Sequence, residues 1–204
     1  MIINLNDSMD ETMKGKRFSL TLLSLLALPT LAATPSFDCT KASSSVEELI
    51  CSNNELATLD NTLNTVYKQA MANYPSAEKK QQKAMQRGWI KGRNECWKSS
   101  DVPSCVADNY RDRILELQIT GGLLKAPETI TLQCNNEKQP VTVAFYNQTD
   151  PSSMVFTIGD DQLIAQQQPT ASGIHYSGQN LEYIEHQGKI DITYMAKKLH
   201  CLAQ

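Results

Sequence analysis

The chain has 204 residues, of which 41% are apolar and 20% charged, so it has enough apolar side chains to bury a core. This composition excludes intrinsic disorder and collagen-like repetition. The 19 basic residues are outnumbered by 22 acidic ones, and the net charge of -3 lacks the positive excess that nucleic-acid binders use against phosphate. We therefore expect no nucleic-acid partner.

The N-terminal segment has the features of a secretory signal peptide. Basic residues at positions 14, 16 and 17 precede an apolar run from Phe18 to Ala33 that ends in small residues. The run is shorter than the about 20 apolar residues that a membrane-spanning helix needs. We predict a signal peptide over 1–33, cleaved after Ala32 or Ala33. The mature protein is then periplasmic or secreted, with no membrane span.

The start of translation and the absence of a lipid anchor are further expectations for this segment. The first twelve residues carry three acids and no base, which is untypical of a leader, so translation starts at either Met1 or Met13. No cysteine directly follows the apolar run, so we do not expect a bacterial lipid anchor.

Six cysteines follow the predicted cleavage site, an even number that favours disulfides over metal ligation in an exported chain. They are Cys39, Cys51, Cys96, Cys105, Cys134 and Cys201, and no two form a Cys-x-x-Cys motif. Many pairings are possible. The spacing of nearest neighbours favours Cys39 with Cys51, Cys96 with Cys105, and Cys134 with Cys201.

From residue 37 to 120 the apolar side chains recur at helical spacing. Ser45 followed by Glu48 has the form of a capping box at the start of a first helix. Further helices are expected after residue 54, from about 76 to 96 and from about 101 to 117. We predict an all-α, disulfide-stapled module over 37–120, with Trp89 and Trp97 packed against its core.

Gly121, Gly122 and Pro127 end the helical pattern, and the apolar period then changes to two. Short alternating runs, such as 141–146, are separated by turn-forming residues, as expected for seven or eight antiparallel strands. We predict an all-β second domain over 128–204, either a small barrel or a sandwich. A bond between Cys134 and Cys201 would tie its ends and cover open strand edges.

The acidic charge belongs to the second half of the chain. Residues 37–124 carry 11 bases and 11 acids, whereas residues 126–204 carry four lysines against eight acids. A compact acidic domain suits a basic partner, because complementary potentials raise association rates. The alternative is that the acids only keep the protein soluble.

Several residues of the helical half resemble the LprI-like N-terminal domain, chiefly in the spacing of cysteine, tryptophan and arginine. They are Phe37, Asp38, Cys39, Val46, Glu47, Ile50, Cys51, Leu56, Leu59, Asp60, Trp89, Arg93, Cys96, Cys105, Tyr110 and Arg113. The resemblance names a family without fixing a binding site. We interpret Tyr110 and Arg113 as packing and surface positions rather than ligands.

The second half resembles the C-type lysozyme inhibitor family (MliC/PliC). The likeness rests on Cys134, the strand ending Phe145-Tyr146-Asn147, the segment Ala171 to Tyr176, Tyr183, Gly188 and Cys201. The resemblance implies an eight-stranded antiparallel β-barrel that blocks c-type lysozyme with a Ser-Gly-x-x-Tyr loop and a second loop. The contact residues that it implies are Ser172, Gly173, Tyr176, Tyr183, Gln187 and Lys189.

The chemistry of a lysozyme explains why such a loop would inhibit it. The enzyme keeps one catalytic carboxyl group protonated and the other ionised. The hydroxyl of Ser172 can donate to a carboxylate or accept from a carboxylic acid, and Gly173 lets the backbone approach closely. Tyr176 is expected to add rigid contact area beside them.

The second loop departs from the family pattern. The family has a lysine at the position of Gln187 and a tryptophan a few residues earlier, and this chain has neither. A neutral amide makes weaker hydrogen bonds than a cation does. Lys189 replaces the missing charge only if the loop is shifted, because strand alternation points it away. His186 supplies a cation only at mildly acidic pH. We expect weaker inhibition or a different lysozyme class.

Nothing in the sequence predicts an enzyme or a cofactor. Ser76 and Lys79 match the Ser-x-x-Lys of penicillin-binding enzymes, but the companion motifs are absent, and we interpret Ser76 as a helix cap. The histidines lack the spacing of a metal site. One alternative to inhibition is a periplasmic module that binds cell-wall glycan or an envelope protein through the helical half. Another is a purely structural envelope protein.

Overall fold

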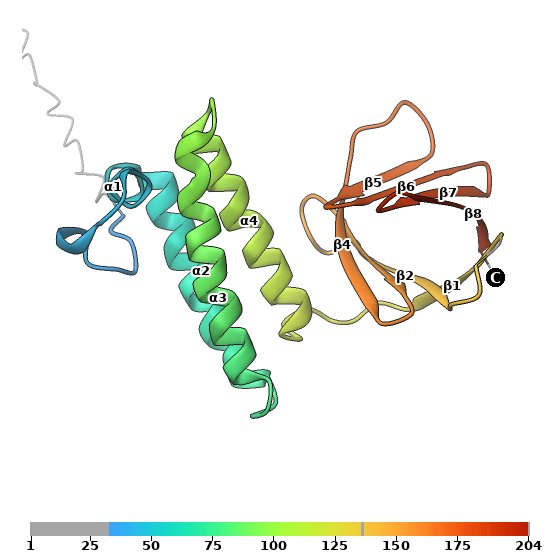
Figure 1. The fold of residues 1–204 in the computed structure, drawn as a ribbon, viewed down its shortest axis with the longest axis horizontal. Coiled ribbons are helices and arrows are strands. Elements are labelled where there is room, and N and C mark those ends of the chain that lie inside the picture. Colours follow the sequence, from blue (N-terminus) through green and yellow to red (C-terminus); the bar gives the residue numbers. More distant parts are fainter. Residues whose placement is uncertain (1–32, 136, 204) are drawn as a thin grey trace, which may run out of the picture. The chain divides into compact units, whose positions relative to one another are not determined.

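The computed structural model describes residues 33–135 and 137–203 (Figure 1). The predicted signal peptide, apart from Ala33, and both candidate start positions lie outside these residues. No helix within the described ranges is long and apolar enough to cross a membrane.

Four α-helices form the first part of the described chain, where the apolar spacing predicts them. Their bounds are α1 Ser45–Ser52, α2 Asn54–Asn73, α3 Lys79–Asn94 and α4 Val102–Thr120, with short 3-10 turns at Cys39–Lys41 and Glu95–Lys98. Packed pairs include α2 with α4, α3 with α4, and α1 with α2 (Figure 1).

The helix starts correct two predictions from the sequence. The N-cap of α1 is Ser44, whose hydroxyl accepts from the amide of Glu47 at 3.2 Å, so the predicted capping pair of Ser45 and Glu48 is wrong by one residue. Helix α3 begins at Lys79 without a side-chain cap, so Ser76 is not its cap. Asn53 and Asp101 cap α2 and α4 through their side-chain oxygens.

The core of the helical region takes apolar residues from α1, α2 and α4. Its largest fully buried members are Tyr110, Ile50, Leu56, Leu117, Val46 and Val106. Trp89 packs against this core, but Trp97 is 58% exposed, so the prediction that both tryptophans pack inside is wrong for Trp97. Disulfides join Cys39 to Cys51 and Cys96 to Cys105.

The rest of the described chain is a closed barrel of eight antiparallel strands, each paired with its neighbours in sequence order, with β1 also paired with β8. The strands are β1 Thr129–Cys134, β2 Val141–Tyr146, β3 Ser153–Ile158, β4 Asp161–Gln167, β5 Ile174–Gly178, β6 Leu181–His186, β7 Lys189–Tyr194 and β8 Lys197–Ala203. Of the two predicted architectures, the second domain is therefore a barrel and not a sandwich.

The barrel is closed covalently as well as by hydrogen bonds. Cys134 and Cys201 are direct partners in the register of β1 and β8, and a disulfide links them. Closure leaves no unpaired strand edge at this seam. The core inside the barrel includes Phe156, Met154, Ile192 and Leu199, each at most 1% exposed.

Candidate functional site

One end of the barrel carries the loop and the turn to which the sequence points. The β4–β5 loop, residues 168–173, contains Ser172 and Gly173, and the two-residue turn between β6 and β7 is formed by Gln187 and Gly188. Strands β5 and β6 are neighbours, and Ile174 is paired with Glu185. The loop and the turn therefore lie side by side at the same end.

The β4–β5 loop approaches β6 closely at Gly173 and contains one internal hydrogen bond. Gly173 has a φ of 77°, and a Cβ atom there would lie 2.1 Å from the carbonyl oxygen of Glu185, so only glycine fits at this contact with β6. The hydroxyl of Thr170 donates to the carbonyl oxygen of Ser172 at 3.0 Å. Ser172 is exposed, and its hydroxyl has no hydrogen-bond partner among the described residues.

The β6–β7 turn is of the tight type that suits a twisted hairpin. Gln187 and Gly188 both have positive φ, 51° and 78°, and the flanking His186 and Lys189 are paired. The carboxylate of Glu185 accepts from the amide of Gly188 at 2.8 Å and so fixes the turn. His186, Gln187 and Lys189 are all exposed.

Tyr176 and Tyr183 lie inside the barrel, and this corrects the expectation that they contact a partner. Each is 3% exposed, because both side chains point inward from paired positions on β5 and β6. Their rings pack with Phe145, at centroid distances of 5.4 and 5.9 Å. Burial raises the pKa of Tyr183 to about 12. These tyrosines therefore belong to the core of the barrel and not to its exposed surface.

The helical region contains a second site that the sequence did not predict. It is a cleft of about 570 Å³, which we call the helical cleft, in the size range of small-molecule sites. Its walls include residues 60, 63, 64 and 67 of α2 and residues 86, 89, 90 and 93 of α3. Both sets have the spacing i, i+3, i+4, i+7, so each lies along one face of its helix.

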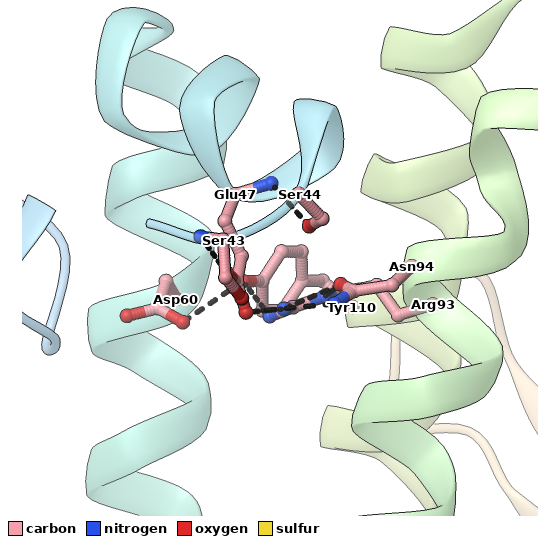
Figure 2. Close-up of polar contacts among 7 residues, drawn as sticks. All are labelled: Ser43, Ser44, Glu47, Asp60, Arg93, Asn94 and Tyr110. Atoms are coloured by element: carbon pink, nitrogen blue, oxygen red, sulfur yellow. Dashed lines mark hydrogen bonds and ion pairs between the residues drawn. The ribbon is translucent and has the colours of Figure 1, made fainter. Parts of the chain in front are cut away.

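A buried polar network borders the helical cleft (Figure 2). The guanidinium of Arg93, 4% exposed, donates to the hydroxyl of Tyr110 at 2.7 Å, and that hydroxyl donates to the carboxylate of Asp60 at 2.8 Å. Arg93 also lies 5.4 Å from the ring centres of Tyr110 and Trp89. Burial raises the pKa of Tyr110, so its hydroxyl stays protonated between the two ions.

Glu47 joins this network from α1. Its carboxylate lies 3.9 Å from Arg93 and accepts hydrogen bonds from the Ser43 backbone amide at 2.8 Å and from Asn94 at 3.4 Å (Figure 2). The Ser43 amide is the main cause that lowers the pKa of Glu47, against the opposing effect of burial. The carboxylate is therefore held in its charged form.

The helical residues on which the family resemblance rests thus meet in space. Asp60, Trp89, Arg93 and Tyr110 come from three helices and gather around one network. Tyr110 is a packing position, as interpreted. Arg113 is not at the surface: it is 3% exposed, donates to the Gln86 side chain at 3.0 Å and pairs with Glu116 at 2.7 Å. The matching i, i+3, i+4, i+7 spacing on α2 and α3 was the signal available in the sequence.

Comparison with known proteins confirms both resemblances. The family described as "Lysozyme inhibitor LprI" matches residues 39–117, and the family described as "Membrane-bound lysozyme-inhibitor of c-type lysozyme" (MliC) matches residues 133–199. The proteins called Lipoprotein LprI from Mycobacterium tuberculosis H37Rv and from Mycobacterium bovis are each 33% identical over 191 residues, which covers 88% of this chain and 95% of the relative. The chain therefore belongs to the LprI family of lysozyme inhibitors, with an LprI-type helical region followed by an MliC-type barrel.

Proposed function

We propose that this protein is an exported inhibitor of c-type lysozyme and that the Ser172 end of its barrel occupies the active-site cleft of the enzyme. The observation that carries the proposal is the exposed Ser172–Gly173 loop, closely packed on β6, beside the exposed Gln187–Gly188 turn on neighbouring strands. Short loops anchored on paired strands lose less entropy on binding than a flexible segment would.

The groups at this end suit the catalytic carboxyl pair of a lysozyme. The hydroxyl of Ser172 is free to donate to the ionised carboxylate or to accept from the protonated one. The amide of Gln187 adds a neutral donor beside it. Lys189 extends from β7 on the side opposite the buried Ile190, so it serves as a charge at the rim rather than as the group that enters the cleft.

This function needs no chemistry from the inhibitor. The protein blocks the cleft sterically and through hydrogen bonds, without a covalent step or a cofactor, so it acts as an inhibitor and not as an enzyme. The signal peptide predicted from the sequence supports an activity in the periplasm or outside the cell, where the protein would meet a lysozyme.

The test is a titration of hen-type lysozyme activity with the full mature protein and two serine variants. Ser172→Ala removes the proposed contact, and we expect its inhibition constant to rise about tenfold, the loss of a hydrogen bond to a charged group. Ser76→Ala removes an exposed hydroxyl before α3 and should inhibit like wild type. Equal inhibition by all three proteins would refute the role of Ser172, and no inhibition by the wild-type protein would refute the proposed function.

A further inference from the structure

The helical cleft has no role in the proposed contact with lysozyme, yet it combines a volume of about 570 Å³ with aromatic rings and convergent polar groups. The face of α2 contributes Asn64 and Tyr67, and the face of α3 contributes Gln86, Trp89 and Ile90. Tyr67, Gln86 and Trp89 are half-buried, and Ile90 is 36% exposed, so a ligand in the cleft would reach all of them. Such a mixture is typical of a small-molecule site.

The charged groups that line the cleft are satisfied within the protein. Asp60 accepts from the hydroxyl of Tyr110 and from the backbone amide of Ser36, at 2.8 and 2.6 Å. Arg93 is shared between Tyr110, Asn94 and Glu47. Asp38 pairs with Lys41 at 3.4 Å. A phosphate or carboxylate ligand would find the buried Arg93 already paired and the exposed Lys41 shared with Asp38, which favours an uncharged ligand.

The groups that stay available are neutral. The side-chain amide of Asn64 and the hydroxyl of Tyr67 make no hydrogen bond to any described residue. The amide oxygen of Gln86 accepts from the buried Arg113, which leaves the amide nitrogen as its free donor. Arg113 therefore acts as a positioning residue for Gln86.

Neutral amide and hydroxyl groups beside aromatic rings are the chemistry that recognises sugars. One face of a pyranose ring is covered by C–H bonds and packs on an aromatic or aliphatic side chain, which removes apolar area from water. The ring hydroxyls need neutral donors and acceptors at its edge. Trp89 and Ile90 offer the apolar wall, and Asn64, Tyr67 and Gln86 offer the polar one.

We infer that the helical cleft binds an uncharged oligosaccharide built from N-acetylated sugars. An acetamido group presents one N–H and one C=O. The amide oxygen of Asn64 can accept from the N–H, and the free amide nitrogen of Gln86 can donate to the C=O. The choice of N-acetylated sugars rests on the proposed function, because the polymer that lysozyme cleaves consists of such sugars. An inhibitor held on this glycan would be concentrated at the place where the enzyme attacks.

The experiment is a direct binding titration without lysozyme. The chain has two tryptophans, and Trp97→Phe removes the exposed one, so the fluorescence of this variant reports on Trp89 in the cleft. The probes are chitotetraose, built from N-acetylglucosamine, and cellotetraose, which has the same linkage without acetamido groups. We expect a saturable change in Trp89 emission with chitotetraose and at least tenfold weaker binding of cellotetraose, checked by calorimetry.

A second substitution added to the Trp97→Phe variant tests whether the sugar binds in the helical cleft. Asn64→Ala and Tyr67→Phe remove polar groups that make no hydrogen bond to the described residues, so both should fold and bind chitotetraose at least fivefold more weakly. Gln69→Ala, an exposed α2 residue outside the cleft, is the matched control and should bind normally, as should Ser172→Ala.

The two proposals can fail separately. A protein that inhibits lysozyme but shows no saturable response to chitotetraose would overturn the glycan site and leave the proposed function standing. Equal binding of the two tetrasaccharides would overturn the N-acetyl assignment. Unchanged affinity in both the Asn64 and Tyr67 variants would overturn the location.

Discussion

At the scale of single residues, Tyr110 has the most demanding position in the helical region. Its hydroxyl accepts from Arg93 and donates to Asp60, and both of those charged groups are at least 94% buried. The tyrosine therefore links a cation and an anion that are almost fully buried. Such a network is stable when complete and costly when one member is lost.

Tyr110→Phe should lower the free energy of unfolding by about 2–4 kcal/mol, because it leaves one buried donor on Arg93 and one buried acceptor on Asp60 unpaired. Tyr67→Phe removes a hydroxyl that has no hydrogen-bond partner within the described part of the chain, and it should cost less than about 0.5 kcal/mol. Both tryptophans lie in the helical region, so urea unfolding followed by tryptophan fluorescence measures the difference. Equal midpoints for the two variants would contradict the role given to Tyr110.

Glu47 should make the stability of the helical region depend on acid pH. Its pKa is lowered in the folded protein, chiefly by the Ser43 amide, so the stabilisation is complete above the pKa of the unfolded chain, about 4.3, and is lost as the pH falls through the lower folded value. Glu47→Gln should be about 1–2 kcal/mol less stable than wild type at pH 7. The gap should narrow in urea titrations as the pH falls below about 4.3 and protonation removes the charge of Glu47. Glu48→Gln, at the exposed neighbouring position, should show no such convergence.

Alanine substitutions at Gly173 and Gly188 distinguish two costs of adding a methyl group: the strain of a left-handed backbone and a steric clash with β6. Both have φ near +78°, but a Cβ at Gly173 would lie 2.1 Å from the Glu185 carbonyl oxygen, whereas a Cβ at Gly188 would meet no atom of the described residues within 4 Å. Gly188→Ala should therefore cost only the left-handed backbone penalty, about 1 kcal/mol. Gly173→Ala should cost at least about 2 kcal/mol more, since the loop must leave β6. Thermal unfolding of the barrel followed by circular dichroism compares them, and equal losses would refute the contact.

At the scale of elements, the sequence predicted the helices and the all-β second half well, because their apolar periods are local properties of the chain. Helix starts were less predictable: Ser44 and Ser45 are adjacent serines, and both have a glutamate three residues later, so only the backbone geometry selects Ser44. For Tyr176 and Tyr183, the alternation of β5 and β6 favoured burial, and the resemblance led us to expect a contact surface instead.

The helical cleft and the network beside it could be predicted from the sequence only in part, for a different physical reason. Residues 60 and 110 are 50 positions apart, and their contact depends on how α2 and α4 are rotated against each other. Helical periodicity gives the face of one helix but not the rotation of its neighbour. The polar positions on α2 and α3 were visible in the sequence, and their convergence was not.

The disulfides should stabilise their elements according to the lengths of the loops they close. The Cys134–Cys201 bond spans 67 residues, and the Cys39–Cys51 bond spans 12. In the chain-entropy picture their loss costs about 4 and about 3 kcal/mol. Replacing Cys134 and Cys201 by alanine should lower the melting temperature of the barrel by circular dichroism and leave tryptophan-detected unfolding unchanged. Replacing Cys39 and Cys51 by alanine should instead destabilise the helical region in tryptophan-detected unfolding and leave the melting temperature of the barrel unchanged. A barrel as stable without its bond would contradict this ranking.

At the scale of the whole molecule, charge is distributed so that the barrel region is acidic and the helical region is neutral. An acidic barrel attracts a basic enzyme over a distance of about 10 Å at moderate salt. Attraction of this kind depends on total charge, whereas contact in the active-site cleft depends on where a charge lies. The two turns at opposite ends of β6 allow these effects to be separated, because Gln187 lies in one and Gln179 in the other.

Gln187→Lys should strengthen inhibition about fivefold, because a charge-assisted hydrogen bond to the lysozyme carboxylates contributes about 1 kcal/mol more than a neutral one. Gln187 already has positive φ, so the lysine adds no new backbone strain. Gln179→Lys adds the same charge at the other end of the barrel and should weaken inhibition slightly by reducing the attraction to a basic enzyme. Inhibition constants at low and high salt distinguish the two: the loss at Gln179 should fade with salt, and most of the gain at Gln187 should persist. A Gln187→Lys variant that inhibits no better than wild type would show that this turn does not reach the carboxylates.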